Sequence, residues 1–208
     1  MTSRWETMKE QSGWHFDVDS KKSDYYEVCT FIGDWSKEQQ YCDHKSSIRD
    51  LVNFPQDNTD WQQDLIALGA DPTVPERKEF EVRPELFKIF NRMASHLQVE
   101  NPDILYTNQQ LGQQVTLHFD KGNLESKDTK RRFLIMLDDW KYGQVVLMGN
   151  SAWVNWRKGQ CITWNSEVPH ATTNLGYDSR PMLIVTGTAK STMQKFLSES
   201  SYERLLEV

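Results

Sequence analysis

Cysteine is scarce in this sequence. Its 208 residues contain three cysteines, Cys29, Cys42 and Cys161, and no two of them are spaced as Cys-x-x-Cys. An odd number without such a pair indicates neither a disulfide framework nor a thiolate zinc site. We therefore expect three free thiols that pack as small hydrophobic side chains.

Long apolar runs and clusters of basic residues are also lacking. Residues 1–10 are polar and charged, and no stretch approaches the length of a membrane span. The net charge is -6, and the 24 Lys and Arg are scattered along the chain, which disfavours binding to a nucleic-acid backbone. These absences predict a cytoplasmic protein without a membrane partner, for which a nucleic-acid partner is disfavoured.

Aromatic residues are abundant, although the hydrophobic fraction is only 38%. The 8 Trp, 9 Phe and 7 Tyr supply large apolar surfaces for a core. The length suits one hydrophobic core with additions, so we expect a single domain over residues 1–208.

The first half of the chain is predicted to be a helix-rich support, over residues 1–105. Apolar residues recur there at helical spacing, and Ser36-Lys37-Glu38-Gln39 has a capping-box pattern. Residues 57–79 are rich in Pro, Asp and Gln and are interpreted as a surface connection. The predicted helices are Ser36 to about Val52, Pro84 to about Leu97 and a short candidate at Trp61 to Leu68.

From about Tyr106 the pattern changes to short runs of β-branched and aromatic residues between turn residues. The absence of alternating long helices favours a mainly β fold with a helical flank: a double-stranded β-helix of the jelly-roll or cupin type over residues 106–190. An amphipathic C-terminal helix is expected within residues 191–208. The candidate strands are Val115–Asp120, Arg132–Leu137, Gln144–Met148, Ala152–Trp156, Gln160–Trp164, Ala171–Thr173 and Pro181–Thr186.

A candidate metal site begins with His118 and Asp120, which share one face if they lie on a strand. A second His-x-Asp, His15-x-Asp17, lies far from the β-rich half and is interpreted as a chance match. The third member is His170, on another predicted strand. Two histidines and one carboxylate form the set that holds Fe(II) in non-haem oxygenases and leaves positions open for a co-substrate and O2.

The alternative is that His118 and His170 are hydrogen-bonded core residues and that Asp120 is a surface acid. His44 and His96 fall within helical stretches and are interpreted as ordinary surface or boundary residues.

Arg180 is the fourth candidate, ten positions after His170. The composition of residues 174–178 is typical of a turn, so we expect a hairpin in which His170 and Arg180 face one another. The guanidinium could then clamp the distal carboxylate of a five-carbon diacid bound at the metal. A divalent cation and Arg180 would offset Asp120 and the two carboxylates of such a diacid.

These residues, with Gln110-Leu111-Gly112-Gln113 and the segment Lys158–Trp164, resemble the 2-oxoglutarate/Fe(II)-dependent dioxygenase superfamily. The sequence is most similar to its prolyl hydroxylase-like and aspartyl/asparaginyl hydroxylase-like branches, over about 106–188. The resemblance implies that His118, Asp120 and His170 bind Fe(II) and that Arg180 binds the C5 carboxylate of 2-oxoglutarate. It also implies O2-dependent hydroxylation of a C–H bond, coupled to decarboxylation of 2-oxoglutarate to succinate.

The sequence departs from this family at Met182, where many members have a hydroxyl residue two positions after the arginine. A second contact to the distal carboxylate must then come from elsewhere, and Tyr106, Asn108 and Thr172 are candidates by their location. The charged stretch 128–132 offers further candidates for an acidic group.

Arg131 or Arg132 could bind an acidic substrate or the C1 carboxylate, although an exposed, charged strand end is the simpler interpretation. The tryptophans of the β-rich half could form a substrate platform, but core packing is the simpler interpretation for each. Trp164 is the exception that stays open, because it ends the strand that leads towards His170. These tryptophans are Trp140, Trp153, Trp156 and Trp164.

The substrate is expected to be a protein side chain such as proline or asparagine, a free amino acid or another small metabolite. Two other functions stay open: a non-catalytic jelly-roll binding module, and a cupin metalloenzyme of another reaction type. Retention of all four candidate residues disfavours the first. The second commonly uses three or more histidines, so Asp120 and Arg180 disfavour it.

Overall fold

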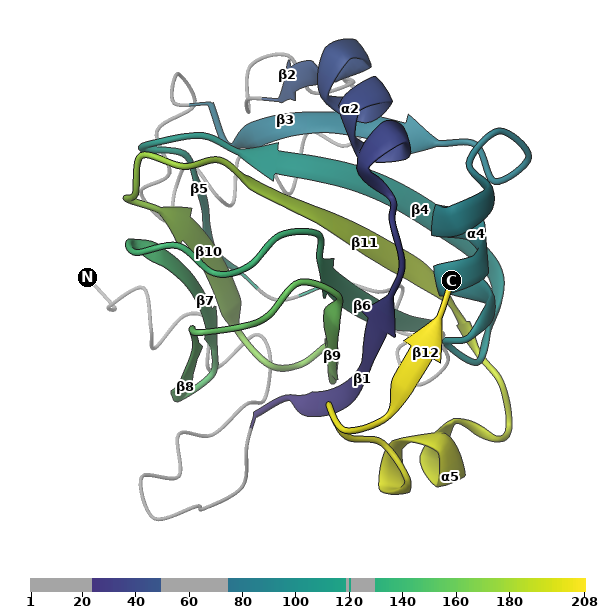
Figure 1. Cartoon of the computed structure of the whole chain (residues 1–208). Helices are drawn as coiled ribbons and strands as arrows, with labels where there is room; N and C mark the ends of the chain where they lie inside the picture. Colours follow the sequence, from purple (N-terminus) through teal and green to yellow (C-terminus); the bar gives the residue numbers. More distant parts are fainter. Residues whose placement is uncertain (1–23, 50–74, 119, 121–129) are drawn as a thin grey trace, which may run out of the picture.

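A computed structural model gives the fold over residues 24–49, 75–118, 120 and 130–208 (Figure 1). The helical candidate Trp61 to Leu68, residues 57–74 of the expected surface connection, and His15-x-Asp17 lie outside the described residues.

The described chain forms two β-sheets and three helices. The larger sheet has the strand order β12-β1-β9-β6-β11-β4-β3-β2, and the smaller has the order β5-β10-β7-β8. The large-sheet strands are β1 (Tyr26–Ile32), β2 (Ser47–Arg49), β3 (Arg77–Val82), β4 (Val99–Gln109), β6 (Lys130–Met136), β9 (Gln160–Trp164), β11 (Arg180–Ala189) and β12 (Leu205–Glu207). The small-sheet strands are β5 (Gln114–His118), β7 (Gln144–Met148), β8 (Ser151–Trp153) and β10 (His170–Asn174).

From β4 to β11 the chain passes repeatedly between the two sheets, as Figure 1 shows. This alternation gives the non-sequential strand order of a jelly roll. The fold is therefore a double-stranded β-helix, as the sequence predicted. Two strands, Gln144–Met148 and Gln160–Trp164, have the predicted bounds to the residue.

Two hydrophobic clusters hold the sheets together. Alternation along β11 divides it between them, because Met182 and Ile184 belong to the cluster between the sheets whereas Leu183 and Val185 belong to the cluster on the other face. The inter-sheet cluster contains Trp153, Trp156 and Trp164, with Trp140 packed against it. The expectation of core packing is confirmed for Trp153, Trp156 and Trp164, whereas Trp140 is only half-buried.

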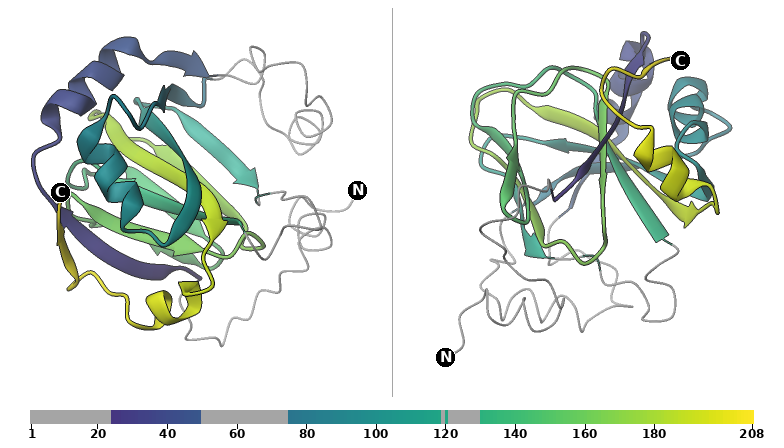
Figure 2. Two further views of the ribbon diagram at one scale, coloured as in Figure 1. Left: turned by 90° about the vertical axis from the view of Figure 1, so that its right-hand side faces the viewer. Right: turned by 90° about the horizontal axis from the view of Figure 1, so that it is seen from below.

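Three helices cover the outer face of the large sheet: α2 (Ser36–Lys45), α4 (Lys88–Ser95) and α5 (Met193–Ser198). In the left view of Figure 2, α2 and α4 lie in front of this sheet. They bury Cys42, Phe90 and Met93 in the outer cluster. All three cysteines are free and buried, as expected.

The predicted helix-rich support is wrong in part, since β1, β2, β3 and most of β4 lie within residues 1–105. Helix α2 ends at Lys45 because Ser46 turns to an extended backbone and β2 begins at Ser47. Helix α4 begins at Lys88, after Pro84. The C-terminal helix is also shorter than predicted, since it ends at Ser198 and β12 follows.

The expected capping box at Ser36 does not form. Helix α2 has no side-chain cap at its N-terminus, and the Glu38 carboxylate instead accepts hydrogen bonds from the backbone N–H groups of Ile89 and Phe90, both at 3.0 Å. A carboxylate there satisfies unpaired N–H groups and opposes the positive end of the α4 dipole. Glu38 therefore fastens one helix to the other.

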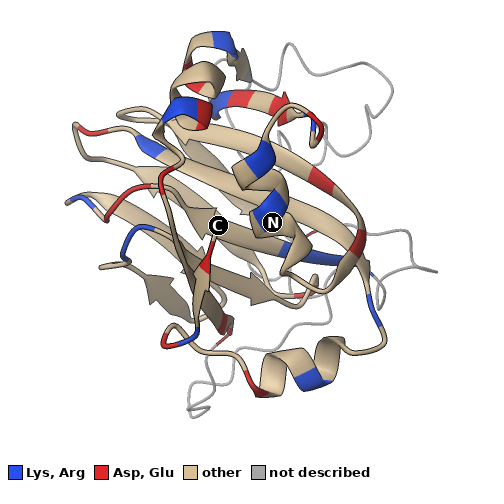
Figure 3. Cartoon of the chain, turned by 45° about the vertical axis from the view of Figure 1, so that its right-hand side comes forward, with Lys and Arg blue, Asp and Glu red and all other residues tan. Residues whose placement is uncertain are grey.

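Charges of both signs are interspersed over the helices and strands in Figure 3. No single-sign stripe is visible among the described residues. Among the same residues, no helix is both long and apolar enough to span a bilayer.

A tight contact between β1 and the turn before β9 gives a stability prediction. Gly159 has a φ of +85°, and an added Cβ would lie 2.0 Å from the backbone oxygen of Phe31. Gly159→Ala must shift backbone as well as adopt a left-handed conformation, so we expect it to lower the free energy of unfolding by at least about 2 kcal/mol. Urea unfolding of the purified variant measures this loss.

Gly112→Ala is the matched control, because Gly112 has a φ of +80° with nothing within 4 Å of an added Cβ. It should cost only the conformational penalty, about 1 kcal/mol. Equal losses in the two variants would show that the close approach to Phe31 has no energetic consequence.

Candidate metal centre

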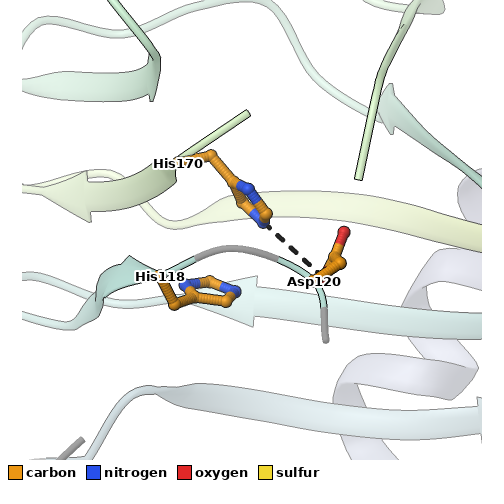
Figure 4. Close-up of side chains that lie close together, drawn as sticks. All are labelled: His118, Asp120 and His170. Atoms are coloured by element: carbon orange, nitrogen blue, oxygen red, sulfur yellow. Dashed lines mark ion pairs between the residues drawn. The ribbon is translucent and has the colours of Figure 1, made fainter. Parts of the chain in front are cut away.

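His118 and His170 meet at one end of the pair formed by β5, an edge strand of the small sheet, and β10. They are direct partners in the antiparallel pairing of β5 with β10, and a register irregularity follows between His170 and Thr172. The sequence placed Asp120 on a strand, Val115–Asp120, but β5 ends at His118 and Asp120 lies just past it. Ligand atoms of the three side chains nevertheless lie within 4.8 Å of one another (Figure 4). The predicted triad is therefore assembled.

Both imidazoles are oriented through the same nitrogen. His118 Nδ1 lies 2.7 Å from the backbone oxygen of Thr116, and His170 Nδ1 lies 3.0 Å from that of Val168. A carbonyl oxygen only accepts, so each Nδ1 carries the proton and each Nε2 presents its lone pair. Backbone contacts of this kind fix the tautomer and direction of metal-binding histidines.

The electrostatics of the triad also suit a cation. Burial, reinforced by His170, lowers the pKa of His118 to about 3, and burial lowers the pKa of His170. Both rings are therefore neutral at neutral pH. Burial raises the pKa of Asp120, but His170 and Arg132 outweigh it and the net shift is downward. Two neutral imidazoles and one carboxylate fit a divalent transition metal.

Two neighbours border the triad. The guanidinium of Arg132, on β6, forms an ion pair with Asp120 Oδ1, and His170 Nε2 lies 3.8 Å from the same oxygen. The indole of Trp164 packs on His170, with ring centroids 5.0 Å apart. Arg131 points elsewhere and donates to the Trp164 backbone oxygen and to Asn165. Of the two arginines considered from the sequence, the structure brings only Arg132 to the site.

The lowered histidine pKa values predict acid sensitivity of the metal-free protein. His118 has an ordinary pKa of 6.5 and a folded pKa of about 3, so the unfolded chain binds more protons between these values. Stability should therefore fall as pH decreases below about 6.5. Chemical unfolding of chelator-treated protein at several pH values tests this. His118→Gln should flatten the decline; an unchanged slope would contradict the assignment.

Arg180 reaches the small sheet by a route that the sequence did not predict. The expected hairpin is wrong, because β10 pairs with β5 and β7 whereas β11 pairs with β4 and β6. Residues 175–179 instead cross from one sheet to the other, and Arg180 is the direct partner of Gln109. Its Nη1 donates to the backbone oxygens of Val145, at 2.9 Å, and Thr173, at 3.3 Å.

The Arg180 guanidinium keeps one edge free among the described residues. Nη2 donates to the Gln109 side-chain oxygen, and Nε is buried without a hydrogen-bond partner. An arginine carries five N–H donors, so Nε and one Nη2 hydrogen stay available, and a carboxylate can accept from both in a bidentate pair. The side chain is 2% exposed.

No described carboxylate offsets the charge of Arg180, although its guanidinium carbon lies 5.9 Å from the ring centroid of Trp156. Burial lowers its pKa to about 9, so it stays protonated at neutral pH, and no described carboxylate pairs with it. A buried, unpaired cation is costly. The free edge could therefore hold an anion.

The other residues proposed to bind the distal carboxylate lie on different faces of their sheets. Tyr106 and Asn108 both donate to Asp43 of α2 at 2.6 Å, on the outer face of the large sheet. The structure does not bring them to the triad or to Arg180. Thr172 lies on the same face of β10 as His170, and its Oγ1 is 2.9 Å from Gln109 Nε2.

Gln109 is the site residue that the sequence analysis missed. It follows Asn108 directly, and the change of side-chain face on a strand places it towards Arg180. The sequence signal for Gln109 was an unusual polar run, Thr107 to Gln110, at the end of β4. The first three residues of this run are fully or almost fully buried. Met182 is buried between the sheets, as its place on β11 requires.

Similarity to known proteins is found among solved structures. No model of a known protein family matches the chain, and no curated protein matches it. Among solved structures, a prolyl-4-hydroxylase from Pseudomonas putida has a TM-score of 0.56 at 11% identity, over 83% of this chain and 96% of that one. A non-haem α-ketoglutarate-dependent epimerase, SnoN from nogalamycin biosynthesis, has a TM-score of 0.57 at 8% identity, over 89% and 83%.

The fold is that of the 2-oxoglutarate oxygenases. A viral collagen prolyl hydroxylase from Paramecium bursaria Chlorella virus-1 is also similar, with a TM-score of 0.49 at 15% identity, over 80% of this chain and 97% of that one. These identities are low, so the comparisons establish the fold, and the site itself must carry any argument about function.

Proposed function

We propose that this protein is an Fe(II)- and 2-oxoglutarate-dependent oxygenase that oxidises a C–H bond. The observation that carries the proposal is the assembly of His118, Asp120 and His170 on one side of a buried guanidinium with a free edge. A metal site alone would fit many cupin enzymes. A metal site with a separate anion site between the same sheets fits a co-substrate that has two acidic ends.

The spacing of the two sites supports this assignment. Arg180 is hydrogen-bonded to the backbone of Thr173 and linked through Gln109 to Thr172. These residues are two and three positions from His170 on β10, which corresponds to about 7–10 Å along a strand. A five-carbon diacid has the length to reach from the triad to Arg180.

The chain's own residues would then bind and position the reactants. His118, Asp120 and His170 would hold Fe(II), which, with 2-oxoglutarate and O2, supplies the oxidising chemistry as the co-substrate is decarboxylated to succinate. Arg180 would orient the co-substrate through its distal carboxylate. The divalent cation and Arg180 would balance Asp120 and the two carboxylates, so the complex can be buried without net charge.

Trp164 would form a wall of the reaction space, since its ring lies against His170. Arg132, the direct cross-strand partner of Trp164, would steady the carboxylate of Asp120. These two contacts exclude water and orient a metal-binding side chain.

The reaction proposed is hydroxylation, with a protein side chain as the first choice of substrate, a free amino acid as the second and another small metabolite as the third. A cytoplasmic location is part of the same proposal. The retained site disfavours a non-catalytic binding module, and the free edge of Arg180 disfavours a cupin enzyme that uses no diacid.

Turnover of the co-substrate tests the function without knowledge of the substrate. Purified protein with Fe(II), ascorbate, 2-oxoglutarate and O2 should form succinate slowly even without a substrate. Asp120→Ala should reduce this rate to background, and the exposed Asp139→Ala should not. A wild-type rate equal to that of Asp120→Ala would contradict the proposal.

A further inference from the structure

We infer that Gln109 is a positioning residue of the distal-carboxylate site and that it directs the hydroxyl of Thr172 onto the same carboxylate. This inference rests on the proposed function. It supplies the second contact that Met182 cannot make, because methionine has no hydroxyl proton to donate.

The orientation of the Gln109 amide follows from its partners. Arg180 can only donate, so the oxygen of the Gln109 amide must face Nη2 and its nitrogen must face the other way. That nitrogen donates to Thr172 Oγ1, at 2.9 Å, and to the backbone oxygen of Glu76, at 3.3 Å. Gln109 is fully buried, so water does not replace these contacts.

The consequence for Thr172 is a fixed donor direction. Its oxygen already accepts the Gln109 N–H, so the hydroxyl proton must point away from Gln109. No described group accepts that proton. Thr172 shares a strand face with His170 and is joined through Gln109 to Arg180. Its hydroxyl and the free Arg180 edge can therefore meet one carboxylate.

Two near-isosteric variants test this arrangement. Gln109→Glu offsets the charge of Arg180 and turns the Thr172 hydroxyl towards itself, so a ligand loses the net charge of Arg180 and the Thr172 donor. Thr172→Val keeps the branched shape and removes only the hydroxyl. Each should weaken 2-oxoglutarate binding about 10- to 100-fold, the effect of losing a hydrogen bond to a charged group.

The discriminating measurement is the dissociation constant of two ligands for Fe(II)-loaded protein under anaerobic conditions. One ligand is 2-oxoglutarate, and the other is 2-oxovalerate, which has the same length but no distal carboxylate. The variants should lose affinity for 2-oxoglutarate alone, and Thr172→Ser should restore it. Gln160→Glu, which adds the same charge at a backbone-bound glutamine on β9, should change neither constant.

Each outcome is decisive. Selective loss for 2-oxoglutarate supports the inference. If binding of both ligands were weakened equally, Gln109 and Thr172 would have only a structural role. If both dissociation constants were unchanged, the two residues would not belong to the site. Either result overturns the inference and leaves the proposed function in place. A wild-type protein that binds neither ligand would overturn both.

Discussion

His170→Ala is expected to abolish tight Fe(II) binding. Loss of a partner that only orients a metal ligand typically costs about 10- to 100-fold in affinity, so loss of the ligand itself should cost more than about 100-fold. His170 is the direct strand partner of His118, and its Nε2 lies 3.8 Å from Asp120 Oδ1. The lone pair of Nε2 is free to bind a metal, because Nδ1 donates to the backbone oxygen of Val168. Competition with a coloured chelator measures the Fe(II) dissociation constant.

The matched control for this variant is His44→Ala, because His44 is an exposed residue in the last turn of α2. It should bind Fe(II) as the wild type does. If His170→Ala bound Fe(II) within about threefold of the wild type, the triad would not be the metal site.

Arg180→Lys should weaken 2-oxoglutarate binding by at least about 30-fold. Lysine keeps a positive charge but has no planar edge, so it cannot hold a carboxylate bidentately or keep the bonds to Val145, Thr173 and Gln109 together. Loss of one partner of a buried charged pair costs about 2–5 kcal/mol. Anaerobic calorimetry with Fe(II)-loaded protein gives the constant directly.

Affinity for Fe(II) should stay close to the wild-type value in Arg180→Lys, because no contact joins Arg180 to the triad directly. Arg157→Lys, at an exposed arginine, is the control. Unchanged binding of 2-oxoglutarate in Arg180→Lys would remove Arg180 from the co-substrate site.

The β-rich half of the fold could be predicted because its strands are short apolar runs with turns between them. Gln144–Met148 and Gln160–Trp164 are bounded by turn residues on both sides, and their limits are correct. In the first half, β3 reads Arg-Lys-Glu-Phe-Glu-Val and contains few apolar residues. Its identity as a strand comes from its pairing with β4, which no local pattern shows.

The error at Arg180 has a similar cause. The residues Asn174 to Ser179 look like a hairpin turn, but a turn sequence does not show whether the two flanking strands pair or enter different sheets. Here Asn174 donates to the backbone of Gln109 and of Asp178 and so supports a crossing between sheets. Arg180 nevertheless contacts β10, because its guanidinium donates to the backbone oxygen of Thr173.

The site could be predicted only where chemistry left a distinctive pattern. His-x-Asp and a later histidine carry such a pattern, and the structure brings these three side chains together. Gln109 and Arg132 carry none, because their roles depend on contacts with distant strands. Tyr106 and Asn108 were misplaced because their strand was not known, and therefore neither was the face on which they lie.

The most direct test of the central claim is an anaerobic titration of metal-free protein with Fe(II) and then 2-oxoglutarate, followed by visible absorption. We expect the charge-transfer band of a 2-oxo acid chelated to Fe(II). The band should vanish in His170→Ala and require much more 2-oxoglutarate in Arg180→Lys. If no band formed in the wild type at any 2-oxoglutarate concentration up to the millimolar range, the oxygenase assignment would be wrong.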